Sequence, residues 1–377
     1  MNKRHIFRDK DATVFFSPAG STQAYIVASS AGPENAASCA YKRIGALLAE
    51  HGLEVVHERA FGTLSGRDAI LQARAKFLTG CENWPVTYIE GLPVAGTTLA
   101  GVQIQAVFRD RVQSIRTIAD AGSPCGRAWS SNGKNFAILQ NMRAAQPAAD
   151  RSAQAAEMIR RAGEILRSQG ISYRHVARTW IYLDDILDWY QPFNQARNEQ
   201  YGQLGLVTSG PGALLPASTG IEGANPHGGA CLMDVLAVSD SRGDQPVAAQ
   251  LSNLRQQDAF AYGSAFSRGA HIRDVDSECF HISGTAAIDQ AGKSMFAGDV
   301  RSQVAATLDH VEALLGQRGM GLSDICSSTA FVKLAGDYDA VRDAMGQRGL
   351  ADLPAVYMVA DVCRAELLFE LDGIAAK

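Results

Sequence analysis

The chain has 377 residues, of which 46% are hydrophobic and 20% are charged, a balance that is ordinary for a globular protein. Its formal net charge of -4 at pH 7 argues against a nucleic-acid or anionic-membrane partner, because both attract strongly basic proteins. Compact units of about 100 to 150 residues are typical, so the length predicts two or three units.

The N-terminus and the cysteines both favour a cytoplasmic protein. The basic segment 1–5 is not followed by an apolar stretch, and no apolar run reaches the roughly 18 residues of a membrane span. The seven cysteines are scattered and none lies in a Cys-x-x-Cys pair, which favours free thiols in a reducing compartment. The eight histidines lack metal-ligand spacing, so we expect no metal site.

The first part of the chain predicts one α+β unit with two helices. Short apolar runs bounded by turn residues predict strands, and longer amphipathic segments predict helices. In chain order we expect strand 24–28, helix 35–50, strand 53–61, helix 66–78, and strands 84–89 and 101–107.

The same order of elements returns twice. The second copy is expected as strand 136–139, helix 152–169, strand 176–183, helix 189–201, and strands 215–221 and 232–238. The third is expected as strand 280–286, helix 300–317, strand 325–334, helix 338–349, strand 353–359 and a strand at the C-terminus. Such a repeat indicates three copies of one unit in a single chain.

Three such units predict an α+β fold in which the chain forms an intramolecular pseudo-trimer. The helices must cover one face of each sheet, which leaves the other face to pack against neighbouring units around a pseudo-threefold axis. We expect units at 1–120, 121–240 and 241–377, with segment 108–133 as a linker. The aromatic-rich insertion 239–277 is expected to be an ordered, functional loop. Clefts between the units are the natural sites for a ligand.

One polar residue lies in the closing strand of each unit. We interpret Gln103, Asp234 and Glu370 as matching positions, because they recur at nearly equal spacing. Glu370 lies in mid-strand among apolar neighbours, where desolvation raises the pKa of a carboxyl group and suits it to act as a general acid. The alternative is a solvent-facing glutamate on a half-exposed strand. Gln103 and Asp234 are expected to be structural or relic positions.

Part of the third unit resembles the RidA (YjgF) family of small trimeric proteins. The resemblance is carried by Ile282–Asp289, Gly298–Val300 and the closing segment Leu368–Asp372. The second unit resembles the family less closely and the first only faintly, so the chain resembles a whole RidA trimer. RidA-type imine hydrolases hold the substrate carboxylate with an arginine that follows Pro-Ala. Ser218 and Val356 take that place here, which counts against imine hydrolysis.

A resemblance to the chorismatases covers almost the entire chain. It is carried by Arg178-Thr179-Trp180, Leu215–Ile221, Phe266-Ser267-Arg268, Ser283-Gly284-Thr285-Ala286, and Cys363-Arg364 followed by Glu370. The resemblance implies a pseudo-trimeric enzyme that removes the enolpyruvyl side chain of chorismate as pyruvate, without a metal or other cofactor. We expect chorismate as the small-molecule partner, no nucleic-acid or membrane partner, and a monomer or weak homo-oligomer.

The resemblance also implies roles for individual residues. Glu370 is implied to be the general acid, and Cys363 is implied to take part in catalysis. Arginine suits the two carboxylates of chorismate, because its guanidinium group can donate two parallel hydrogen bonds. These residues place the site between units two and three. The residues implied to bind substrate are Arg178, Arg268, Gly284, Thr219, Tyr262 and Arg364.

For several of these side chains the residue pattern leaves another interpretation open. Arg178 can be a rim arginine that extends past aromatic neighbours, Arg268 a surface residue, and Arg364 a residue that pins a turn. Cys363 can be an inert buried thiol, or it can add to a ring intermediate if Arg364 favours its thiolate.

Chorismatases differ in their product, and this chain resembles the aromatising type. That type is marked by a glycine at the position of Gly284 and by a cysteine seven residues before the glutamate, the position of Cys363. The expected product is 3-hydroxybenzoate, alone or with 4-hydroxybenzoate. The alternatives are a chorismate hydrolase that gives a dihydroxycyclohexadienoate, a RidA-type enamine or imine hydrolase, and a non-enzymatic small-metabolite binding protein.

Overall fold

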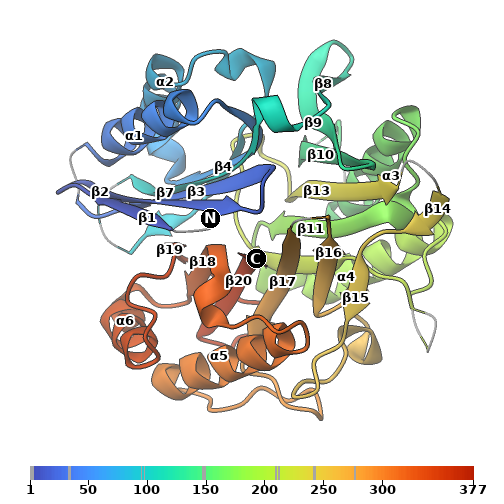
Figure 1. The fold of residues 1–377 in the computed structure, drawn as a ribbon. Helices are drawn as coiled ribbons and strands as arrows, with labels where there is room; N and C mark the ends of the chain where they lie inside the picture. The colour runs from blue at the N-terminus through green and yellow to red at the C-terminus, as the bar shows by residue number, and fades with distance from the viewer. Residues whose placement is uncertain are drawn as a thin grey trace.

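Three mixed sheets lie around a common centre, and the helices lie on the outside (Figure 1). The computed structural model describes residues 4–32, 35–94, 96, 98–146, 150–208, 210, 213–240, 243–275 and 277–377. Each sheet is covered by two helices on its outer face, so its inner face meets the other sheets. The predicted α+β pseudo-trimer of similar units is confirmed.

The first sheet has the strand order β1-β2-β3-β7-β4-β5. Its strands are β1 (His5–Arg8), β2 (Ala12–Ala19), β3 (Gln23–Ser30), β7 (Leu99–Phe108), β4 (Leu53–Gly62) and β5 (Thr87–Glu90), and its helices are α1 (Ala36–Glu50) and α2 (Arg67–Phe77). One further short strand, β6 (Leu92–Pro93), leaves this sheet and pairs with β19 (Ala355–Val359) of the third. The chain therefore ties its first unit to its last through the backbone.

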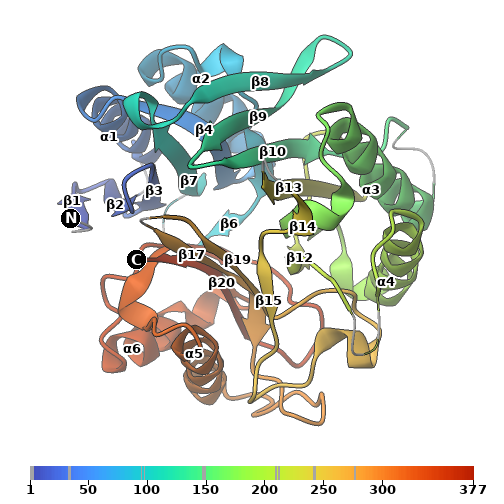
Figure 2. The same ribbon diagram turned by 45° about the vertical axis from the view of Figure 1, so that its right-hand side comes forward.

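The second sheet has the order β12-β11-β13-β10-β9-β8, with β14 paired to β13. Its strands are β12 (Ala217–Glu222), β11 (Val176–Leu183), β13 (Cys231–Asp240), β10 (Lys134–Met142), β9 (Ser123–Ser131), β8 (Ser114–Asp120) and β14 (Gly243–Pro246). Figure 2 shows α3 (Arg151–Ser168) and α4 (Ile186–Gln203) on its outer side.

The third sheet has the order β15-β16-β17-β20-β18-β19-β6. Its own strands are β15 (Ala249–Leu251), β16 (Gly269–Arg273), β17 (Glu278–Ala286), β20 (Phe369–Ala376), β18 (Ile325–Val332) and β19, and its helices are α5 (Val300–Gly316) and α6 (Tyr338–Gln347). Short 3₁₀ helices occur at Leu64–Gly66, Cys81–Asn83, Arg109–Arg111, Tyr173–His175, Ala259–Tyr262, Leu322–Asp324 and Ala335–Asp337.

Alternation along the strands separates a central core from three outer cores. In the second unit, Ile181 of β11 packs on the helix side with Ile159 and Phe193. Its neighbours Trp180 and Tyr182 point to the opposite face and join the central core, to which all three sheets contribute. Full burial of a large apolar side chain contributes about 1.5–3 kcal/mol. The central core therefore holds the three units together.

Two matching helices begin with the same kind of cap. The Asp150 carboxylate accepts a hydrogen bond from the backbone N–H of Ala153 at the start of α3 (3.0 Å). Asp299 accepts one from Ser302 at the start of α5 (3.1 Å). Each cap is worth about 1 kcal/mol and fixes where its helix begins. The start of α3 lies one residue before the predicted one, and the start of α5 coincides with it.

Several strands were not predicted. The segment 108–133, expected as a linker, contains β8 and β9, which extend the second sheet. The insertion 239–277 contains β14, β15 and β16 and is ordered where the structure describes it. β8 has two large apolar residues, Ile115 and Ile118, whose spacing of three does not give the alternation of a strand. Because β8 ends at Asp120, the second sheet begins before residue 121, and the boundaries between units stay a prediction.

The predicted match of Gln103 and Asp234 with Glu370 is wrong by two residues. Gln103 lies opposite Arg59 in β4, and Asp234 lies opposite Trp180 in β11. The residue in that position of β20 is Asp372, which lies opposite Thr329. A shift of two residues keeps every side chain on the same face of a strand, so the apolar pattern does not reveal it.

Glu370 therefore has apolar counterparts in the other units. It lies opposite Phe331 in β18, whereas the matching closing-strand positions hold Leu232 in the second unit and Gly101 in the first. Glu370 is thus an addition of the third unit, and not the last of three related polar residues.

Candidate active site

Glu370 lies on the inner face of β20 and packs directly on Gly284 of the neighbouring β17. Only 4% of Glu370 is exposed, so the alternative of a solvent-facing glutamate is wrong. Gly284 lies in a bulge of β17 between Ile282 and Thr285. A Cβ atom at Gly284 would lie 2.2 Å from Oε1 of Glu370. Glycine at this position therefore makes room for the carboxyl group.

The expected rise in the pKa of Glu370 is confirmed. Burial, followed by the nearby Asp372 carboxylate, raises the pKa of Glu370 to about 8, against the opposing charges of Arg268 and Arg178. Most of this side chain is therefore protonated at neutral pH. A protonated carboxyl group in a buried site is a suitable general acid.

Arg178 crosses from the second unit to the third. Its side chain, on β11, is fully buried, and Nη2 donates hydrogen bonds to Oγ1 of Thr219 and to Oδ2 of Asp372 (3.0 Å to Asp372). Thr219 itself donates to the same Asp372 oxygen (2.8 Å), and the backbone N–H of Thr329 donates to Oδ1 (3.2 Å). The rim position considered for Arg178 is therefore wrong.

Two donors of Arg178 have no partner. Nε and Nη1 are buried and make no hydrogen bond to any residue that the structure describes. Burial lowers the pKa of Arg178 to about 10, so the group still carries its charge at neutral pH. A buried donor without a partner costs about 1–3 kcal/mol, and more when it is charged. Nε and Nη1 lie on different edges of the guanidinium group, so each offers a separate charged donor to an anion.

Arg268 reaches the same site from the insertion before β16. Only 2% of it is exposed, so the surface alternative is wrong. Its Nε donates to the backbone oxygen of Gln257 (3.1 Å), as does Nη2. Its guanidinium carbon lies 5.4 Å from the ring centre of Phe266, whose other neighbour is Arg197 at 5.6 Å. The insertion thus orders a second buried arginine whose charge acts on Glu370.

Cys363 lies close enough to Glu370 for the carboxylate to affect the protonation of its thiol. Burial, followed by the charge of Glu370, raises the pKa of the Cys363 thiol to about 12. Arg364 lowers this pKa less, and it donates to the backbone oxygen of Gly292 (2.8 Å) and to Oγ of Ser294 (3.3 Å). Arg364 therefore favours the thiolate, but burial and the charge of Glu370 outweigh it. Of the two interpretations of Arg364, the turn-pinning one has contacts in its favour.

Most of the predicted site residues come together. The side chain of Tyr262 lies outside the described part of the structure. Asp372 was not predicted, although it lies on the same face as Glu370 two residues later and could have been found from that alternation. Arg197 was also missed, because it lies on a helix and reaches the site through Phe266. We use the name Glu370 cluster for Glu370, Gly284, Cys363, Arg178, Thr219, Arg268 and Asp372.

The other two junctions between units carry related polar contacts. Asp234 of the second unit bonds to two residues of the first, His57 (Nε2 to Oδ2, 2.8 Å) and Thr87 (Oγ1 to Oδ1, 2.7 Å). Gln103 of the first unit donates to Oγ1 of Thr329 in the third (3.2 Å). Each closing strand therefore reaches the preceding unit in cyclic order. This supports a structural role for Asp234 and Gln103.

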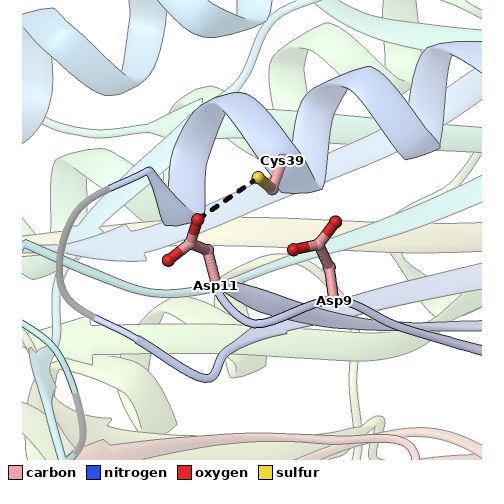
Figure 3. A group of neighbouring side chains, drawn as sticks. All are labelled: Asp9, Asp11 and Cys39. Carbon is pink, nitrogen blue, oxygen red and sulfur yellow. Dashed lines mark hydrogen bonds between the residues drawn. The ribbon is translucent and has the colours of Figure 1, made fainter.

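One group of three potential metal ligands occurs in the described residues, far from the Glu370 cluster. Asp9, Asp11 and Cys39 lie between the β1–β2 turn and α1 (Figure 3). The Cys39 thiol donates to Oδ2 of Asp11 (3.7 Å), and burial, followed by the two aspartates, raises its pKa. The thiol therefore keeps its proton.

In the described part of the chain, no helix is long and apolar enough to cross a membrane.

Comparisons with known proteins agree with the geometry. Residues 258–377 match the family model described as Endoribonuclease L-PSP. A 3-hydroxybenzoate synthase of Streptomyces hygroscopicus is 26% identical over 239 residues, which are 56% of this chain and 66% of that protein. A chorismatase of the same organism is 27% identical over 232 residues, 55% of this chain and 64% of that protein. These matches span slightly less than two thirds of either relative.

A solved structure extends the likeness to most of the chain. A crystal structure of a chorismatase superposes with a TM-score of 0.64 at 20% sequence identity, and the match covers 85% of this chain and 92% of that one. This likeness concerns the fold. The predicted resemblance is confirmed: residues 258–377 match the Endoribonuclease L-PSP (RidA/YjgF) family model, and the fold of the chain is similar to that of a chorismatase.

Proposed function

We propose that the protein is a chorismatase that removes the enolpyruvyl group of chorismate as pyruvate and gives 3-hydroxybenzoate. The observation that carries the proposal is the pairing of a buried, protonated Glu370 with two unpartnered guanidinium donors of Arg178. An acid and an anion-binding group in one buried place match what this substrate requires. The similarity to a 3-hydroxybenzoate synthase and to a chorismatase supports the choice of substrate.

The arginines would hold the two carboxylates of chorismate. Nε and Nη1 of Arg178 can each donate a charge-assisted hydrogen bond to a carboxylate oxygen. Arg268 supplies a second buried positive charge. When Glu370 is protonated, Arg178 and Arg268 exceed the single charge of Asp372, so the cluster attracts an anion. Thr219 and Asp372 hold Arg178 from the other side and fix its orientation.

Glu370 would start the reaction as a general acid. It gives its proton to the methylene carbon of the enol ether, which leaves an oxocarbenium centre on the side chain. Trapping of that centre by an oxygen nucleophile and cleavage of the ether bond release pyruvate. Pyruvate and 3-hydroxybenzoate together contain all the atoms of chorismate, so the overall reaction needs no oxidant or reductant.

Cys363 would act after this first step. Its thiol is protonated at neutral pH, so addition of sulfur to a ring intermediate requires a base. Glu370 is a carboxylate once it has given up its proton, and it lies close enough to influence the thiol. We therefore assign Glu370 a second role as the base for Cys363. It takes the thiol proton as the C–S bond forms and a ring C–O bond opens. The C–S bond then breaks when the ring loses a proton and becomes aromatic, which returns the thiol and releases the product. Arg364 is the remaining predicted substrate residue whose side chain the structure describes. It supports the turn that carries Ser294.

The high pKa of the thiol favours one competing function. If Cys363 never loses its proton, the ring intermediate cannot be held as a thioether, and hydrolysis to a dihydroxycyclohexadienoate becomes the alternative outcome. Imine hydrolysis has less support, because Ser218 occupies the place of the arginine that it needs. The side chain of Ser218 accepts a hydrogen bond from Thr179 (2.8 Å).

The seven cysteines are all free thiols, which supports the predicted cytoplasmic location.

The test is to incubate the purified protein with chorismate and to follow pyruvate and the ring products by chromatography. Pyruvate together with 3-hydroxybenzoate is the expected result. Pyruvate with a non-aromatic diene diol would support the hydrolase and reject the role of Cys363. Binding of chorismate without pyruvate release would reject catalysis and support a metabolite-binding protein.

A further inference from the structure

A cavity of about 240 Å³ lies between the first and second units, apart from the Glu370 cluster. α2 contributes Arg67 to its wall, the middle of α3 contributes Arg161, and the segment after β10 contributes Arg143. The loop between β12 and β13 closes one side with His227. Three arginines from both units therefore face one cavity.

This cavity occupies the position that corresponds to the Glu370 cluster, one unit earlier. β10 and β17 are both interrupted by a two-residue bulge, Gln140–Asn141 in β10 and Ser283–Gly284 in β17. The bulges match, because each lies opposite the residues that flank Asp234 in β13 or Asp372 in β20. Gln140–Asn141 lines the cavity, as Gly284 lines the Glu370 cluster. The cavity is thus lined by the bulge of the second unit that is equivalent to the bulge at Gly284 in the third unit.

The loops agree with this correspondence. His227 lies in the loop before the closing strand of the second unit, and Cys363 lies in the same loop of the third. The groups that would perform chemistry differ. Leu232 stands at the position of Glu370, and Asn141 stands at the position of Gly284. The cavity therefore has no acid at the place where the Glu370 cluster has one.

The charge in the cavity is positive. Arg143 donates to the backbone oxygen of Asn141 (3.2 Å) and forms no ion pair with a described carboxylate. Nε of Arg67 is buried and has no partner among the described residues, and its neighbour Asp68 is 85% exposed, so solvent weakens that ion pair. Arg161 is paired with Asp120 (2.7 Å). One carboxylate thus faces three guanidinium groups.

The other titratable groups of the cavity are neutral. Burial, followed by the charges of Arg143 and Arg67, lowers the pKa of His227 to about 4. Burial raises the pKa of the Cys125 thiol to about 11. Neither group offsets the arginines at neutral pH. An anion is therefore the ligand class that the electrostatics favour.

Apolar side chains also line the cavity. They are Leu71, Val86 and Met142, together with the ring of Tyr88. A purely inorganic anion would leave this apolar surface without contacts. A carboxylate on a flat ring would use both parts, because the ring can pack on the apolar wall while the carboxylate meets the arginines.

We propose that this cavity is a second, non-catalytic binding site for a small ring-bearing carboxylate of the size of benzoate. Arg143 and Arg67 hold the carboxylate, and the wall formed by Leu71, Val86 and Met142 holds the ring. Binding here does not depend on chorismatase activity, because none of these residues belongs to the Glu370 cluster.

The test measures binding of 3-fluorobenzoate by ¹⁹F NMR to the full-length protein and to three variants. Arg143→Leu and Arg67→Leu each remove a donor, and we expect each to weaken binding about tenfold or more, the size of one charge-assisted hydrogen bond. Arg116→Leu is the control, because Arg116 is an exposed arginine that lines a different cavity at this junction. Binding to this control should equal binding to the unaltered protein. Thermal melting of each variant checks that it is folded.

The location is tested by soaking crystals with 3-bromobenzoate and recording the anomalous signal of bromine. A peak beside Arg143 supports the proposal. A peak beside Arg178 alone, or no peak at all, would overturn it, as would unchanged binding to Arg143→Leu. Failure of the chorismate assay would leave both measurements unaffected, so the two proposals can fail separately.

Discussion

Asp372 and Asp234 occupy the same position in their strands, and each reaches across to the preceding unit, yet their partners differ. Asp234 bonds to His57, whose pKa burial lowers, so this pair contains a histidine that is mostly neutral at pH 7. Asp372 bonds to Arg178, which occupies the place of His57 in its own unit. His57 binds Asp234 through one ring nitrogen. Arg178 has more donors than the described residues use, because its Nε and Nη1 have no partner among them.

The bulges next to these aspartates show the same contrast. In the second unit, Asn141 fills the bulge, adopts a left-handed backbone (φ 57°), and donates its N–H to Asp234 (3.0 Å). In the third unit, Gly284 leaves the space that Glu370 occupies. Asp234 therefore has partners within the protein on both of its oxygens, whereas Arg178 keeps two donors without a partner among the described residues. Similar backbones thus supply a structural joint in one place and a reaction site in another.

Glu370→Gln should have the largest effect on this contrast. Glutamine keeps the size of the side chain but cannot donate the proton, so we expect turnover to fall about a thousandfold, within the range of general-acid catalysis. Chorismate binding should persist, because the donors of Arg178 are unchanged. Pyruvate release and calorimetric titration measure the two quantities. Glu366→Gln is the control, since Glu366 is exposed and bonds to Ser294; equal losses in both variants would contradict the assignment.

Gly284→Ala should have the next largest effect. The new Cβ would lie 2.2 Å from Oε1 of Glu370, so the carboxyl group must move away from its position. Displacement of a catalytic group by about 1 Å can cost about a hundredfold in rate, and we expect a loss of that order. The matched change Gly346→Ala, on α6 with nothing within 4 Å of its Cβ, should leave turnover unchanged. Steady-state kinetics on both variants separates local displacement from a general effect.

The pH dependence should follow the acid. Glu370 acts in its protonated form and its pKa is about 8, so kcat/KM should stay level as pH rises toward 8 and then fall about tenfold per pH unit. The sign is that of an acid with a raised pKa, because activity is lost by deprotonation. A profile that instead falls below pH 5 would indicate that a carboxylate base, and not this acid, limits the rate.

Much of the fold could be predicted from the sequence, because the helices and the inner strands carry a strong apolar pattern. The predicted strand 176–183 coincides with β11, and helix 300–317 ends one residue beyond α5. β8 was missed because a strand at the edge of a sheet needs few apolar residues. The three-unit organisation followed from the order of elements and did not need the edge strands.

The site could be predicted only in part. Glu370 was found because a carboxylate among apolar residues is unusual in a strand, and that signal is local. Asp372 was missed because the repeat was aligned two residues out of register, and only hydrogen-bonded pairing fixes the register. Arg364 was included because it follows Cys363, but adjacent residues of a turn can point in different directions. Contacts across units, such as Arg178 with Asp372, depend on the folded chain.

Asp234→Asn should have the smallest effect on activity. It tests whether the junction that contains Asp234 is structural, in contrast to the junction that contains Asp372. Loss of the charge weakens the hydrogen bond to His57. We expect the free energy of unfolding, measured by urea denaturation, to fall by about 2 kcal/mol, the usual size for a hydrogen bond to a charged group. Turnover should change less than twofold, because the variant lies at the junction without Glu370. The matched variant Asp372→Asn should lose both stability and turnover, since it loosens the hold on Arg178. If Asp234→Asn reduced turnover as much as Asp372→Asn, the two junctions would be acting as one site, and the division into a structural joint and a reaction site would be wrong.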